Sequence, residues 1–368
     1  MSKIRSRPFP FSTVMVAVTA VLTVIAVAGA SLLSAERPRS YSIVDTATVS
    51  VRSTTLGVAD SDLYFATQAQ IDAALTKVAA LGVKNVRVLI PWYDVNPDPG
   101  VFDWTRIDRV VASATTRKMG IVAVVTHSPD WAVAPGDTPV ISPPAKVGDY
   151  GDFTAIVAKR YKGKISAYEI WNEPNGGTSF YPTPDPARYT QLLKAAYVKI
   201  KAVSSAVTVI AGVLGAVPTS TTDKTINAPT FLTAMYNAGA KGYFNAISFH
   251  PYQLSTPYSQ GLSLAGSPYN EDTAMHNTML SKGDGGKRIW ATEYGLPTSV
   301  VTEAHQAAYI KDFMDAWGRR SWHGPMFLYT TQDATSGYDA GLQFGLYRAD
   351  GTAKPAVQTV KDYTATHR

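Results

Sequence analysis

The sequence of 368 residues contains no cysteine. A chain without thiols cannot form disulfide bonds, bind a metal through thiolates, use a cysteine nucleophile or carry a lipid on an N-terminal cysteine. Its stability must therefore come from the packing of its core. With 45% hydrophobic and 11% aromatic residues, a chain of this length is globular and can bury a large core.

The motifs of several enzyme classes are also absent. The sequence has no HExxH, no GxSxG and no phosphate-binding glycine loop. Its six histidines are not at the spacing of metal ligands, so we expect no catalytic metal and no cofactor. Lysine and arginine do not gather into a patch with interleaved aromatic residues, so we expect no nucleic-acid partner.

The N-terminus has the composition of a targeting segment. It is basic, has no acidic residue before Glu36, and contains a nearly unbroken apolar run from Val14 to Leu33. The tripeptide Ala28-Gly29-Ala30 has the small-x-small form that a signal peptidase accepts. A run of about 20 apolar residues is also long enough to span a bilayer. Two interpretations stay open, a cleaved signal peptide and an uncleaved anchor that tethers the protein to a membrane.

Both interpretations place the rest of the chain outside the cytoplasm, because the basic residues stay inside. We therefore expect a secreted or cell-envelope protein. Residues 1–40 would be the signal peptide or transmembrane anchor with a short linker, and residues 41–368 would be one folded domain.

Short apolar segments rich in β-branched residues alternate with helical patterns along this domain. The apolar segments lack a polar alternation, which is typical of strands covered on both faces. We expect strands at 55–59, 83–90, 121–126, 165–170, 207–213, 246–249, 288–292 and 326–329.

The intervals between these strands have helical periodicity. Ile71, Leu75 and Val78 share one face of a helix that ends before Gly82, and a second apolar stripe runs from Ile107 to Ala114. Further helices are expected at 150–161, 186–203, 229–238, 272–281, 302–317 and 355–363. Eight strand-helix units predict an α/β fold, a single (β/α)8 TIM barrel with long βα loops, rather than a doubly wound sheet.

In such a barrel the active site lies at the carboxyl ends of the strands. Two glutamates occupy such positions, Glu173 in the segment IWNEPN after the fourth strand and Glu293 in ATEYG at the seventh. Paired carboxylates can cleave a glycosidic bond, since one protonates the leaving oxygen while the other attacks the anomeric carbon or activates water. Aromatic and amide side chains nearby suit a sugar, so we expect an oligosaccharide or polysaccharide substrate.

These motifs resemble those of the clan A glycoside hydrolases, a large (β/α)8 group that includes families 5, 10, 39 and 51. The segment FGLYRADGTAKPA at 344–356 is similar to the end of family 39 and its bacterial exopolysaccharide-hydrolase relatives. The resemblance covers residues 54–363. One position departs from it, because Tyr329 stands at the end of the eighth strand where many family 5 members have a tryptophan. That departure argues against family 5.

The resemblance implies that Glu173 is the general acid/base and Glu293 the nucleophile of a retaining enzyme. Such an enzyme forms a glycosyl-enzyme intermediate and holds its carboxyl groups about 5–5.5 Å apart. Asn172 would bind the sugar hydroxyl next to the anomeric carbon. The residues implied to orient the carboxylates or keep the nucleophile ionised are Tyr252, His250 and Arg87.

Structural roles compete with these assignments. Arg87 could instead form an ion pair that closes the barrel, and His127 could be a buried histidine rather than a ligand of a sugar hydroxyl. Glu169 is expected to be structural and to face the same way as Trp171 and Glu173. The aromatic candidates for substrate binding, for which core packing is the alternative, are Trp92, Trp131, Trp171 and Tyr329.

The sequence therefore predicts a secreted or membrane-tethered retaining glycoside hydrolase. One alternative is a transglycosylase, in which another sugar intercepts the same intermediate. The other is a carbohydrate-binding barrel without turnover, against which the paired glutamates argue. The resemblance makes β-glucosides and β-xylosides the first substrates to test.

Overall fold

The computed structural model of the protein describes residues 48–335 and 339–367. The predicted signal peptide or membrane anchor lies outside the described residues. Within those two ranges, no helix is both long enough and apolar enough to cross a membrane.

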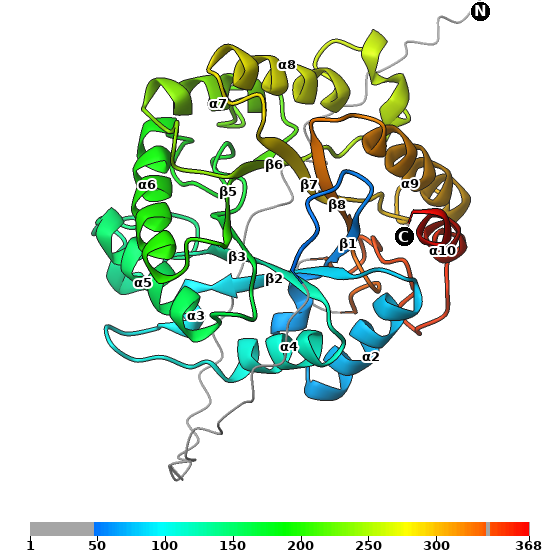
Figure 1. Ribbon diagram of the computed structural model, residues 1–368, viewed down its shortest axis with the longest axis horizontal. Helices are drawn as coiled ribbons and strands as arrows, with labels where there is room; N and C mark the ends of the chain where they lie inside the picture. Colours follow the sequence, from blue (N-terminus) through cyan, green and yellow to red (C-terminus); the bar gives the residue numbers. More distant parts are fainter. Residues whose placement is uncertain (1–47, 336–338, 368) are drawn as a thin grey trace, which may run out of the picture. The chain divides into compact units, whose positions relative to one another are not determined.

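The strands form a closed parallel barrel, as the sequence predicts (Figure 1). Each strand pairs in parallel with the next along the chain, and the first pairs with the last. Their bounds are β1 (Leu56–Ala59), β2 (Asn85–Pro91), β3 (Gly120–Thr126), β4 (Ala167–Ile170), β5 (Thr208–Gly215), β6 (Ala246–His250), β7 (Arg288–Tyr294) and β8 (His323–Tyr329).

The eight predicted helices are all present and surround the barrel (Figure 1). They are α2 (Gln68–Ala80), α4 (Thr105–Thr116), α5 (Val147–Arg160), α6 (Pro186–Val203), α7 (Ala228–Asn237), α8 (Pro268–Ser281), α9 (Glu303–Gly318) and α10 (Pro355–Thr366). Short helical turns that the sequence analysis did not predict lie in the loops, namely η2 (Ser61–Tyr64), α3 (Trp92–Val95), η3 (Asp130–Ala132) and η4 (Tyr258–Ser263).

The interior of the barrel is filled by its own small cluster of side chains. Ala59, Val122 and Ile210 pack there with two large rings, Trp290 and Phe327. Two glycines provide the room for these rings. A Cβ atom on Gly57 would lie 2.3 Å from the Phe327 ring, and one on Gly324 would lie 2.4 Å from the Trp290 ring. Side chains fill the barrel below the catalytic end, as is usual in this architecture.

A buried polar cluster joins α8 to the start of β8. Asp272 and His323 are both fully buried, and His323 Nε2 lies 2.9 Å from Asp272 Oδ2. The same carboxylate accepts hydrogen bonds from the Tyr258 hydroxyl and forms an ion pair with Arg320. Because several groups depend on one carboxylate, its removal would strand them without a partner.

We expect Asp272→Ala to lower the free energy of unfolding by about 3–5 kcal/mol, since it leaves the mostly buried Arg320 without its anion. Urea unfolding followed by circular dichroism measures this. The control is Asp315→Ala, which breaks a solvent-exposed pair with Lys311 on α9 and should cost less than about 1 kcal/mol. Equal losses in the two variants would contradict the assignment of a structural role to the Asp272 cluster.

Candidate active site

Arg87 of β2 lies at the centre of a network with side chains from β7, from β4 and from the segment directly after β4. Its Nε atom is 2.6 Å from Glu169 Oε2, its Nη1 atom is 2.6 Å from Glu293 Oε1, and its Nη2 donates to Asn172 Oδ1 at 2.9 Å. Burial opposes the charge of this guanidinium, but the two carboxylates raise the pKa of Arg87 above its usual value. The sequence left an ion pair and a site role as alternatives; the structure shows the ion pair with Glu169 and also places Arg87 in contact with Glu293.

Glu293 is held from two sides. Arg87 contacts its Oε1 atom, and the Tyr252 hydroxyl donates to its Oε2 atom at 2.8 Å. Burial and the neighbouring Glu293 charge raise the pKa of Tyr252 well above its usual value, so this hydroxyl keeps its proton and stays a donor. The Glu293 side chain is 14% exposed. Its orientation is fixed while part of it remains reachable.

Glu173 follows β4 in an unusual backbone conformation. Its φ is +45°, and that of Trp171 is +70°, so two non-glycine residues adopt the left-handed region on either side of Asn172. Such conformations are costly and concentrate at functional sites. Asn175 holds the segment in place, because its side chain accepts from the Gly215 amide and donates to the Gly215 and Ile226 carbonyls, each at 2.9 Å.

His250 links the two catalytic candidates. Its Nδ1 atom lies 2.9 Å from Glu173 Oε1 and 3.5 Å from Glu293 Oε2. These two carboxylate oxygens are therefore at most the sum of those distances apart, 6.4 Å. Burial acts to raise the pKa of Glu173, but the His250 hydrogen bond and the positive charges of His250 and Arg87 outweigh it and hold the pKa below its usual value. His250 itself is 1% exposed, whereas the Glu173 side chain is 28% exposed.

His127 directly follows β3 and has a φ of +68°, and its Nδ1 atom has no hydrogen-bond partner among the described residues. Burial lowers its pKa to about 4, so the ring is neutral near pH 7. A neutral ring retains one donor and one acceptor, which suits a hydroxyl. Trp131 is partly exposed, and its indole nitrogen donates to the Asn96 carbonyl at 3.0 Å.

Two aromatic candidates lie in the core instead of the site. Trp92 is fully buried and stacks on Phe153 with ring centroids 5.3 Å apart. Trp171 is fully buried too, and its indole nitrogen donates to the Ser179 carbonyl at 2.7 Å. The Trp171 ring packs edge to face against Tyr150 of α5 and against Phe180, whereas Glu169 bonds Arg87. The predicted common facing of Glu169, Trp171 and Glu173 is therefore wrong, because strand alternation ends at Ile170.

Tyr329, the last residue of β8, is partly buried and donates its hydroxyl to the Asp339 carboxylate. Asp339 lies in the loop after β8, where the sequence offered no strand-end signal. Burial raises the pKa of Asp339 to about 6, with Asp62 and Glu293 adding to the rise and the Tyr329 hydrogen bond opposing it. Phe344 packs edge to face against Tyr329 at 5.4 Å. Asn175, Asp339 and Phe344 were not among the predicted site residues.

The sequence profile of the cellulase family, glycosyl hydrolase family 5, matches residues 45–323. The chain belongs to this family. It is accordingly a clan A glycoside hydrolase, as the strand-end motifs predict. The argument against family 5 from Tyr329 is wrong, because the family profile matches most of the chain despite that residue.

Solved structures of families 5 and 39 share the fold. A family 39 glycoside hydrolase from Bacteroides cellulosilyticus is 22% identical, with a TM-score of 0.68, over 86% of this chain and 64% of the other. A monomeric β-xylosidase from Caulobacter crescentus is 17% identical, with a TM-score of 0.65, over 86% of this chain and 69% of the other.

A family 5 subfamily 18 enzyme from Streptomyces cattleya, solved with N-acetylglucosamine, is 17% identical, with a TM-score of 0.66, over 87% of this chain and 81% of that one. No curated protein matches this chain by sequence. The chain spans less than two thirds of the family 39 enzyme. At these identities the likeness establishes the fold.

The contact between His250 and Glu173 makes a prediction about protonation. We expect His250→Phe to raise the pKa of Glu173, because it removes the hydrogen bond and positive charge that oppose burial. Carbon-13 NMR of the labelled glutamate carboxyl groups measures the titration, with the Glu173 signal identified by its loss in Glu173→Gln. His367→Gln, which changes an exposed histidine, is the control. An unchanged or lower pKa in His250→Phe would contradict the inferred coupling.

Proposed function

We propose that this family 5 protein is a retaining glycoside hydrolase with Glu173 as general acid/base and Glu293 as nucleophile. The observation that carries the proposal is that both carboxylates contact the same nitrogen of His250. Their nearest oxygens are closer than the roughly 6.5–9.5 Å separation that leaves room for water in an inverting pair. A retaining mechanism needs the shorter spacing, because the second carboxylate attacks the sugar directly.

In the first step, a Glu293 oxygen attacks the anomeric carbon while the bond to the leaving oxygen breaks. Glu173 transfers its proton to that oxygen, and a glycosyl ester of Glu293 forms. Tyr252 and Arg87 hold the attacking carboxylate in one orientation. Asn172, oriented by Arg87, supplies its amide hydrogens to the adjacent sugar hydroxyl, where a contact strengthens in the transition state.

In the second step, water attacks the anomeric carbon and gives a proton to Glu173. The ester bond breaks, and Glu293 is released as a carboxylate. Glu173 must be an acid in one step and a base in the other. Its contact with His250 at 2.9 Å holds the carboxyl group in one orientation for both steps.

We propose a polysaccharide or glycoconjugate as the substrate and a location outside the cytoplasm, in the secreted fraction or the cell envelope. The basic and apolar N-terminal sequence supports the location. Equatorial linkages are the first to test, beginning with β-glucosides and β-xylosides. Hydroxyl-binding candidates such as His127 and the partly exposed Trp131 ring provide the polar and stacking contacts that a sugar requires.

The test is covalent trapping of residues 41–368 with a panel of 2-fluoro-glycosyl inactivators, read by intact mass and peptide mapping. We expect a mass increase of one sugar on Glu293 and none in Glu293→Gln, since the amide is a poor nucleophile. A conservative control is Asp315→Ala, which alters the surface of α9 and should label like the wild type. An adduct on another residue would overturn the assignment of the nucleophile.

Glu173→Ala tests the acid/base role. We expect kcat to fall by about 10²–10⁴-fold for substrates with poor leaving groups, because proton transfer to the leaving oxygen is lost. Azide, which needs no general base, should restore turnover of an activated aryl glycoside and give a glycosyl azide of retained configuration. Release of an inverted azide, or no azide effect, would contradict the assignment. Longer oligosaccharides among the wild-type products would identify transglycosylation. The absence of both a covalent adduct and a product would favour a carbohydrate-binding barrel without turnover.

A further inference from the structure

Phe344 is packed among the aromatic residues beside Glu293. Its ring lies edge to face with Tyr252, with centroids 6.0 Å apart, and edge to face with Tyr329, with centroids 5.4 Å apart. Gly295 leaves space for this arrangement, because a Cβ there would be 3.2 Å from the Phe344 ring and 2.3 Å from the Tyr329 carbonyl oxygen. Phe344 thus supports Tyr252, the hydroxyl donor to Glu293.

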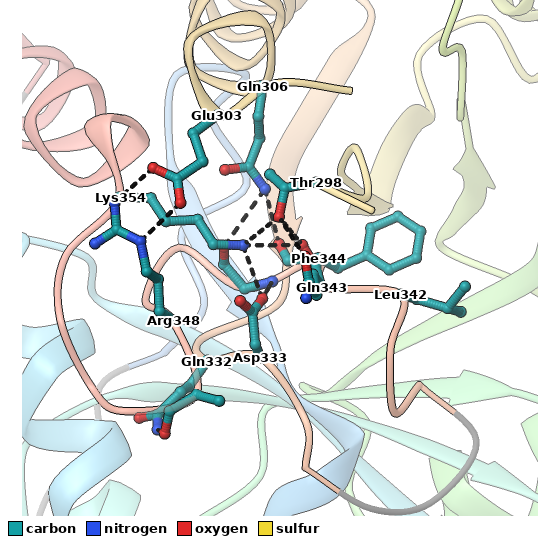
Figure 2. Close-up of polar contacts among 12 residues, drawn as sticks. Thr298, Glu303, Gln306, Gln332, Asp333, Leu342, Gln343, Phe344, Arg348 and Lys354 are labelled. Carbon is teal, nitrogen blue, oxygen red and sulfur yellow. Dashed lines mark hydrogen bonds and ion pairs between the residues drawn. The ribbon is translucent and has the colours of Figure 1, made fainter. Parts of the chain in front are cut away.

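Phe344 begins the segment FGLYRADGTAKPA, and Lys354 near its end is 2% exposed. The ammonium group of Lys354 donates to Asp333 Oδ1 at 2.8 Å, to Thr298 Oγ1 at 2.9 Å and to the Gln343 carbonyl at 2.9 Å (Figure 2). An ammonium has three hydrogens, and all of them are used. The last of these bonds fixes the residue immediately before Phe344.

The residue after Phe344 is fixed by the same carboxylate. The Gly345 amide donates to Asp333 Oδ1 at 2.8 Å, and a Cβ on Gly345 would lie 2.3 Å from the Asp333 amide nitrogen. Gln306 of α9 is fully buried and donates to the Phe344 carbonyl at 3.2 Å (Figure 2). It also donates to the Leu296 carbonyl at 2.9 Å. The backbone on both sides of Phe344 is therefore held by buried polar groups.

We propose that Lys354 is a positioning residue for Glu293: its ion pair with Asp333 fixes the backbone around Phe344, and Phe344 holds Tyr252 in its bond to Glu293. This inference rests on the proposed function, because it assigns Lys354 a place in the reaction of that site. A buried ion pair is weak evidence for stability, since well-packed apolar residues often stabilise a fold as well or better. The hydrogen bonds from Lys354 to Gln343 and Thr298 are directional, so they fix the position of the backbone in a way that apolar packing does not.

The experiment compares three variants. Lys354→Met removes the ammonium and retains an unbranched stem. The double variant Lys354→Met with Asp333→Asn also removes the carboxylate charge that the single variant leaves buried, so that it folds if the single variant does not. Arg348→Met is the matched control, because it breaks the exposed ion pair with Glu303 on the outer side of the same segment.

Two readouts are needed. The first requires no activity: 4-fluorophenylalanine is placed at position 344, and its fluorine-19 resonance reports the ring environment. We expect the resonance to shift or broaden in both Lys354 variants and to stay unchanged in Arg348→Met. The second is kinetics on a glycoside that the wild type cleaves. We expect kcat to fall by about 10- to 100-fold with KM within about threefold, because a misplaced nucleophile affects the transition state.

Coupling to Phe344 completes the test. In a Phe344→Ala background, Lys354→Met should reduce kcat by less than about threefold, since contacts that act through one residue are not additive. Full additivity, an unchanged fluorine resonance, or a rise in KM with kcat unaltered would overturn the positioning role. A shifted resonance in a protein that turns over no glycoside would contradict the proposed function. An enzyme that cleaves glycosides with kcat unchanged by Lys354→Met would contradict this inference alone.

Discussion

The geometry of the site depends on the guanidinium of Arg87. It reaches from β2 to Glu169 on β4, to Glu293 on β7 and to Asn172 beyond β4, and so fixes three side chains across the barrel interior. A planar fork with fixed donor directions can do this, whereas the flexible ammonium of a lysine cannot. The cost of burying the charge is offset only because carboxylates contact it on two sides.

Glu169 has a role that appears only over a reaction cycle. In the mechanism that we propose, Glu293 becomes an ester and loses its negative charge, and without a second carboxylate Arg87 would then be left buried without an anion. Glu169 lies 2.6 Å away and does not react, so the guanidinium keeps one full counter-charge throughout. In the proposed mechanism, Glu169 keeps the charge of Arg87 balanced while Glu293, on the same arginine, reacts. Arg87 thus forms the ion pair that was one alternative for it, and the proposed mechanism gives it the site role that was the other.

The barrel and the strand-end glutamates could be predicted because both follow from local rules. Apolar segments of strand length report burial on both faces, and parallel strands bring their carboxyl ends to one rim. The orientation of Trp171 could not be predicted in this way, since a left-handed backbone interrupts the alternation on which that prediction depends. Phe344 and Asp339 lie at the site because of the conformation of a loop, and the periodicity of apolar residues does not predict loop conformation. Trp92 looked like a strand-end aromatic, but helix α3 begins at that residue and buries it.

At two places, a buried polar side chain fixes the backbone of a loop by hydrogen bonds. Asn175 bonds the backbone at Gly215 and Ile226, and Lys354 bonds the backbone at Gln343. Each is a nearly fully buried polar side chain that would be costly to leave unsatisfied, so each backbone segment has one favourable position. One anchor lies two residues after Glu173, and the other acts on the loop beside Glu293. The strands of the barrel form the rim of the site, and Asn175 and Lys354 fix the positions of two loops on that rim.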